Sequence, residues 1–76
     1  MIHILREKIV ANLNRKFEAE IGTHATNIEI LLEQGVGVAE HPDIMATIEE
    51  ELNIIANFED KRAVLNKYFG EKTNEN

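Results

Sequence analysis

The chain is divided by the stretch Gly35-Val36-Gly37-Val38-Ala39-Glu40-His41-Pro42-Asp43-Ile44, which holds two of its four glycines and its only proline. A glycine after the last apolar turn of a helix accepts the left-handed conformation that ends helices. Proline suits the first helical position, where its missing N–H costs nothing. We therefore predict that one helix ends at Gly35, and that a second starts at Pro42 with His41 as its N-cap. The predicted turn consists of Gly35, Gly37, Glu40, His41, Pro42 and Asp43.

Residues 2–34 have the apolar spacing of a helix rather than the alternation of a strand. The apolar side begins with Ile2, Leu5, Ile9, Leu13 and Phe17, and continues, displaced around the axis, with Ile21, His24, Ile28, Leu31 and Leu32. Gly22 is the weak point, because glycine destabilises a helix interior by about 1 kcal/mol relative to alanine. One continuous or bent helix, which we favour, and a break near Gly22 both remain open.

Residues 42–69 repeat the helical pattern. The apolar face consists of Ile44, Ile48, Ile55, Phe58, Leu65 and Phe69, flanked by Leu52 and Ile54. Gly70 is the second stop signal. Residues 71–76 contain no apolar side chain, so we predict a disordered C-terminal tail. The predicted organisation is one helical-hairpin domain over residues 1–70 followed by that tail.

The fold class that these patterns predict is all-α, an antiparallel two-helix hairpin that self-associates into a helical bundle. A chain of 76 residues without cysteine has a marginal core unless association reinforces it. We expect a dimer that forms a four-helix bundle, or a larger closed assembly. Arg6 and Arg62 are expected to bridge copies, most simply to Glu20, Glu51 or Glu59 across an interface. The predicted interface residues are Arg6, Glu20, Glu51, Arg62, Leu52 and Ile54.

The charge distribution excludes some partners. The chain carries 14 acidic and 8 basic residues, a net charge of −6, whereas duplex nucleic acid needs a basic surface. No apolar run approaches the roughly 20 residues that span a bilayer, so we predict no membrane partner. Bases dominate residues 1–17 and acids dominate residues 35–76. That asymmetry suits head-to-tail association of copies, although two differently solvated surfaces are the simpler interpretation.

Catalytic and metal chemistry find little support in the sequence. Glu20 and His24 share a helix face with Glu51 available on the other helix, but bundle metal centres use Glu-x-x-His at a spacing of three. We predict instead a histidine at the edge of the core that hydrogen-bonds to a neighbouring acid. The chain has no serine and no cysteine, so only threonines and one tyrosine remain of the common hydroxyl and thiol nucleophiles. We predict no catalytic residue, no metal and no cofactor, and hence no enzyme.

A basic segment near the N-terminus supports an alternative function. Cations, an amide and an aromatic ring in a few turns suit a phosphate-bearing ligand. The alternative is an oligomeric protein that sequesters a nucleotide or another anionic small molecule at subunit interfaces. Residues 17–60 contain no lysine or arginine, which argues against a phosphate-binding pocket in the middle of the hairpin. A solvated basic face is the simpler interpretation of the basic segment. The candidate ligand-binding residues are Arg6, Asn12, Arg15, Lys16 and Phe17.

The pattern Gly-x-Gly-x-x-Glu-His-Pro-Asp-Ile, followed by Ile48-Glu49-Glu50-Glu51-Leu52 and Phe58-Glu59-Asp60-Lys61, resembles small uncharacterised helical-hairpin proteins of tailed bacteriophages. The resemblance covers residues 27–69. It implies a viral gene product in the cytoplasm of a bacterial host cell or in a virion, and it identifies no functional residue. We expect a non-enzymatic helical protein that acts through oligomerisation and protein contact. Such a protein is an assembly component or an inhibitor of a host factor or defence, with a bacterial host protein as a further partner.

Overall fold

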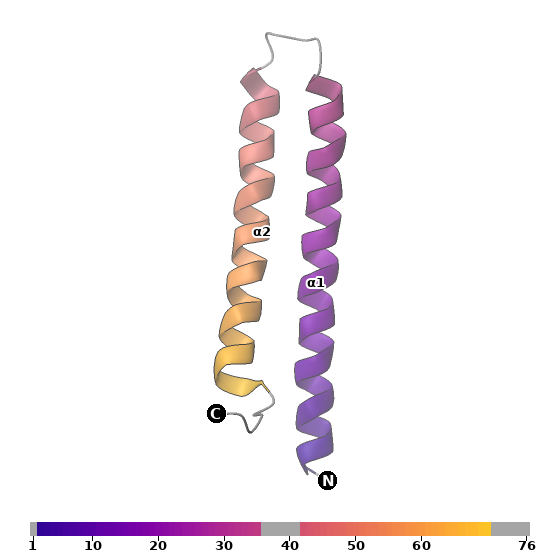
Figure 1. The fold of residues 1–76 in the computed structure, drawn as a ribbon, viewed down its shortest axis with the longest axis vertical. Helices are drawn as coiled ribbons and strands as arrows, with labels where there is room; N and C mark the ends of the chain where they lie inside the picture. The colour runs from indigo at the N-terminus through magenta and orange to yellow at the C-terminus, as the bar shows by residue number, and fades with distance from the viewer. Residues whose placement is uncertain (1, 36–41, 71–76) are drawn as a thin grey trace.

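The protein forms two long helices that run side by side in opposite directions (Figure 1). The structure is a computed structural model and describes residues 2–35 and 42–70. Helix α1 spans Ile2–Gly35 and α2 spans Pro42–Phe69. The predicted all-α hairpin is therefore confirmed, together with the end of one helix at Gly35 and the start of the next at Pro42. Gly37, Glu40, His41 and the tail lie outside the described residues.

Helix α1 continues through Gly22 without interruption for 34 residues. Gly22 is exposed, and a Cβ built there would meet nothing within 4 Å. The glycine is therefore not required by close packing. The neighbouring turns of the helix tolerate its low propensity, since the penalty of about 1 kcal/mol is small against the contacts of a long helix. Of the two alternatives, the continuous helix is confirmed.

The helices meet along a seam that repeats every seven residues. In α1 the partly buried Val10, Phe17, His24 and Leu31 are one heptad apart, and in α2 so are Ile44, Glu51, Phe58 and Leu65. A second row in α2 completes the seam with Ile48, Ile55 and Arg62. This spacing is that of a left-handed coiled coil, in which the contact stripe stays in register with the partner helix.

Aromatic and polar layers alternate along the seam. The Phe17 and Phe58 rings lie 6.0 Å apart between centroids, which is a favourable distance for aromatic packing. One heptad closer to the connection in each helix, His24 contacts Glu51. Beside the seam, the Asn14 and Asn66 amides exchange two hydrogen bonds of 2.8 and 3.0 Å. These paired layers define the register of the two helices, because a shift by one turn would break all of them together.

The hairpin has no enclosed core. Within the described residues, no side chain counts as buried. The radius of gyration is 17.3 Å, against about 11 Å for a compact domain of this length. The surface area is 6157 Å², roughly 1,400 Å² more than a compact monomer of 8.7 kDa exposes. Two helices alone can cover only one side of each other, so the apolar side chains beside the seam stay open to solvent.

Neither α1 nor α2, as far as the structure describes them, contains a stretch with the length and apolar character needed to cross a bilayer.

Candidate functional site

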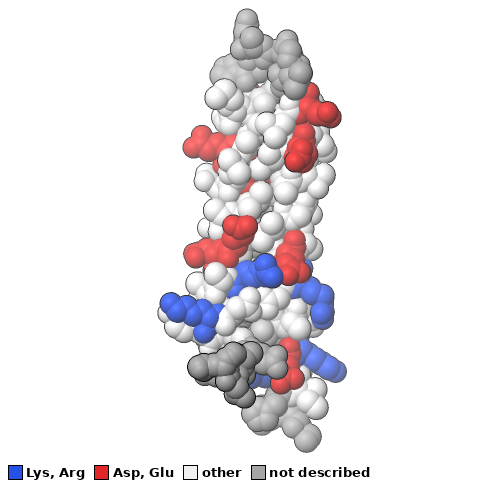
Figure 2. Space-filling view, in the orientation of Figure 1, with Lys and Arg blue, Asp and Glu red and all other residues white. Residues whose placement is uncertain are grey.

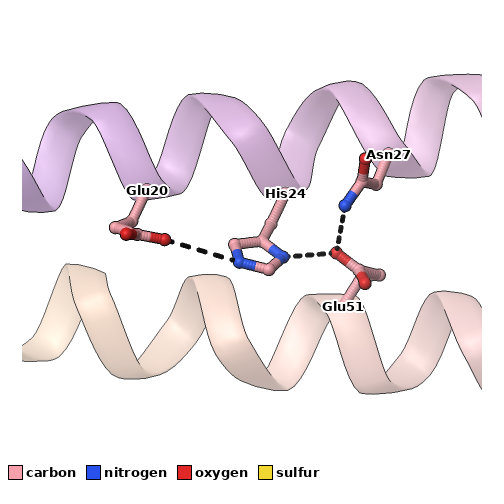
Figure 3. A network of polar contacts seen from close by, with 4 residues as sticks. All are labelled: Glu20, His24, Asn27 and Glu51. Carbon is pink, nitrogen blue, oxygen red and sulfur yellow. Dashed lines mark hydrogen bonds and ion pairs between the residues drawn. The ribbon is translucent and has the colours of Figure 1, made fainter.

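A polar layer crosses the seam between Glu20, His24 and Asn27 of α1 and Glu51 of α2 (Figure 3). His24 and Glu51 both occupy seam positions, and their side chains are only 19% and 17% exposed. Nδ1 of His24 lies 2.6 Å from Oε1 of Glu51, and Asn27 donates its amide N–H to the same oxygen at 3.3 Å. Nε2 of His24 lies 3.6 Å from Oε1 of Glu20. The imidazole is thus held between two carboxylates.

Glu51 is kept ionised by its neighbours. The hydrogen bond with His24 is the largest cause that holds the pKa of Glu51 below its ordinary value of 4.5, and the Asn27 bond acts in the same direction. Partial burial opposes both by favouring the neutral carboxyl group. An ionised carboxylate only accepts hydrogen bonds. Nδ1 of His24 therefore carries the proton in this layer, while Nε2 pairs with Glu20 only when the ring is protonated.

The two carboxylates of the polar layer lie on opposite sides of the imidazole ring. They contact opposite nitrogens of the ring, so they cannot converge on one ion. No group of three or more potential ligands that could hold a metal occurs in residues 2–35 and 42–70. The prediction of a histidine bonded to a neighbouring acid is confirmed. Sequence reasoning missed Asn27, although its position three residues after His24 places it on the same side of α1.

Arg62 lies in the seam and binds an acid of the same chain. Its Nη2 lies 2.7 Å from Oε2 of Glu18, whereas the sequence suggested Glu20, Glu51 or Glu59 of another copy. Nε of Arg62 is buried and has no hydrogen-bond partner among the described residues. The guanidinium is therefore only partly satisfied within the hairpin. The predicted bridge between copies through Arg62 stays a prediction.

The candidate ligand-binding residues do not gather at one place. Phe17 packs in the seam against Phe58. Arg15 donates to Oδ1 of Asn12 at 2.6 Å, and Arg6 borders an apolar groove. Successive helical residues point about 100° apart, so Lys16 and Phe17 diverge. Within one hairpin the cations and the aromatic ring therefore form no shared pocket.

An apolar groove with a volume of about 420 Å³ lies where α1 begins and α2 ends. Leu5 and Ile9 were expected on the interior stripe but are more than half exposed. The physical reason is that the seam follows a seven-residue repeat, and Ile9 precedes the seam position Val10 by one residue. We call this surface the open-end groove; it is lined by Leu5, Arg6, Ile9, Val10, Leu13, Leu65 and Phe69.

A second apolar surface lies toward the connection between the helices. Leu52 is 51% exposed and Met45 is 73% exposed, and both follow a seam position of α2 by one residue. Leu32 follows the seam position Leu31 of α1 in the same way and is also more than half exposed. Ile54, the other apolar residue predicted for the interface, is partly buried. We call this surface the loop-half patch; it consists of the exposed Leu32, Met45 and Leu52 together with the partly buried Ile21 and Ile28.

Comparison of the chain with protein-family models, with curated proteins and with solved structures gave no significant match.

Proposed function

We propose that this protein is a non-enzymatic helical hairpin that self-associates into a helical bundle and acts through contact with other proteins. The observation that carries the proposal is the missing core. Large apolar side chains are paired along one seam only, and several of the others form two open surfaces. Soluble monomers rarely leave contiguous apolar surface of this kind uncovered.

The amount of open surface suits an interface. A standard protein interface buries about 800 Å² on each partner. The hairpin exposes roughly 1,400 Å² beyond a compact monomer of its mass, so covering one such surface would remove more than half of this excess. Packing a second hairpin against the first is the simplest way to achieve this, because four helices can enclose a core that two cannot.

The chemistry of the described residues also supports contact over catalysis. The polar layer around His24 lacks a nucleophile, and its titratable groups contact each other. Together with the sequence resemblance, this favours an assembly component or an inhibitor of a bacterial host protein as the role in the cell. The association itself is the part of the proposal that can be measured directly.

Substitution of Leu52 by aspartate tests the proposal. Leu52→Asp places a charge in the loop-half patch and removes an apolar contact of about 1.5–3 kcal/mol. Sedimentation velocity should then show association weakened by at least about tenfold. Val64→Asp is the matched control, since Val64 is also in α2, is 45% exposed and lies outside both apolar surfaces. Equal behaviour of the two variants would contradict the proposal.

A further inference from the structure

The two faces of the hairpin differ along its length. On one face, Glu18 pairs with Arg62 and Asn14 pairs with Asn66. Glu18 and Asn66 each follow a seam residue, and Asn14 lies one helical turn before Glu18. These contacts therefore show that residues following the seam in both helices share a face. Positions seven and fourteen residues closer to the connection have the same orientation on the helix. In α1, the positions equivalent to Asn14 are Ile21 and Ile28, and those equivalent to Glu18 are Ala25 and Leu32. In α2, the positions equivalent to Asn66 are Glu59, Leu52 and Met45. This face is therefore polar near the chain ends and apolar in the loop-half patch.

The open-end groove lies on the opposite face. Ile9 precedes the seam residue Val10, whereas Leu32 follows the seam residue Leu31. Since successive residues point about 100° apart, Ile9 and Leu32 flank the seam on opposite sides. One copy thus carries two apolar surfaces that differ in both face and end, and that cannot cover each other.

The surroundings of the two surfaces have opposite charge. Residues 19–58, which we call the loop half, contain eight acids and no lysine or arginine. The open half, residues 2–18 and 59–70, contains seven bases and four acids. Figure 2 shows the same division on one face, where lysine and arginine lie only in the open half, whereas acids are spread over the loop half and extend into the open half. Arg6 lies in the groove wall itself.

From this we infer that the partner of the loop-half patch is the open-end groove of a second copy, in a head-to-tail arrangement. The inference rests on the proposed self-association and specifies its geometry. Two loop halves facing each other would bring eight acids against eight, whereas unlike halves bring acids against bases. When one such contact joins two copies, the groove of one copy and the patch of the other stay uncovered. Such heterologous contacts build rings or staggered chains rather than closed two-fold dimers.

Complementation of two variants tests the arrangement. Leu52→Asp disables the patch and leaves the groove intact, and Ile9→Asp does the reverse. Each variant alone should sediment at the monomer mass of 8.7 kDa, and an equimolar mixture should form a species of twice that mass and stop there. Val64→Asp is the control, because Val64 is 45% exposed, lies outside both apolar surfaces and should keep wild-type association. Circular dichroism confirms that each variant remains helical.

Disulfide trapping gives a second measurement that needs no disruptive charge. The chain has no cysteine, so Met45→Cys and Leu5→Cys each introduce a single thiol. After mixing and mild oxidation, the disulfide between the two different variants should exceed both homodisulfides at least about tenfold, because one contact orientation brings the thiols together. A predominant homodisulfide at position 45, or a mixture of charge variants that stays monomeric, would overturn the head-to-tail arrangement. A wild-type chain that is monomeric throughout would instead overturn the proposed self-association.

Discussion

At the scale of single residues, the hairpin depends on polar side chains in positions where a coiled coil places apolar ones. His24, Glu51 and Arg62 occupy seam positions, and each is at least partly compensated by a neighbour. Polar residues at such positions lower stability but restrict the number of registers that two helices can adopt. Substitutions that remove the charges or hydrogen bonds of these residues should therefore change the stability of the hairpin.

Ionisation of Glu51 should make the hairpin sensitive to acid. The pKa of Glu51 is lower in the folded chain than its ordinary 4.5, so folding favours the ionised form. The stabilisation is fully present above the unfolded pKa and is lost as the pH falls through the lowered folded pKa. In urea titrations, the difference in free energy of unfolding between the wild type and Glu51→Gln should therefore shrink below pH 4.5. Glu50→Gln is the control, because it removes a charge from an exposed neighbouring residue. The difference in free energy of unfolding between the wild type and Glu50→Gln should not shrink in this way at low pH.

Gly22 should be the easiest site at which to stabilise the protein. The structure leaves space for a methyl group there, and Ala is favoured over Gly in a helix interior by about 1 kcal/mol. Thermal unfolding at fixed concentration should show Gly22→Ala more stable by that amount. Gly70→Ala is the contrasting variant, since a Cβ at Gly70 would lie 2.6 Å from the carbonyl oxygen of Asn66. A destabilised Gly22→Ala would mean that α1 is not a regular helix at this point.

At the scale of the helices, much was predictable because helix signals are local. Gly35, Pro42 and the apolar spacing sufficed to predict both helices and their antiparallel packing. The pairing of individual side chains was less accessible, since the relative register of α1 and α2 depends on contacts between distant residues. Arg62 shows the difficulty: its long side chain can reach several acids, and only the register selects Glu18.

The interior stripe shows a second limit of the sequence. Leu5 and Ile9 fit a helical period of 3.6 residues together with Phe17, but the packed seam repeats every 3.5 residues. The stripe therefore leaves the seam toward the start of α1 and becomes the wall of the open-end groove. Glu51 was predicted near His24 but not inside the seam, because an acid does not count in an apolar pattern.

The polar layer should act as one unit in the pairing of the two helices. His24→Leu leaves Glu51 without its main hydrogen bond, and Glu51→Leu leaves the His24 ring without its acceptor, so each single variant should unfold at lower urea concentration than the wild type. The double variant His24→Leu/Glu51→Leu should recover stability, because two apolar side chains can pack across the seam. A double-mutant cycle with additive effects would show that the two residues do not interact.

At the scale of the whole molecule, the shape of the hairpin explains why association is expected. The chain is extended, with principal dimensions of 57, 22 and 16 Å, and its apolar surfaces lie at opposite ends. Composition alone indicated the need for reinforcement, since a short chain without cysteine cannot use disulfides. Composition could not show that the exposed apolar residues form two separate surfaces, because that depends on which residues the seam occupies.

The mass of the wild-type chain in solution tests the central claim most directly. Sedimentation equilibrium should be measured over a wide concentration series, with circular dichroism on the same samples to confirm the helices. We expect a weight-average mass that rises with concentration to at least twice 8.7 kDa. A fully helical protein that stays at 8.7 kDa at every concentration would contradict the claim that the hairpin completes its core by self-association.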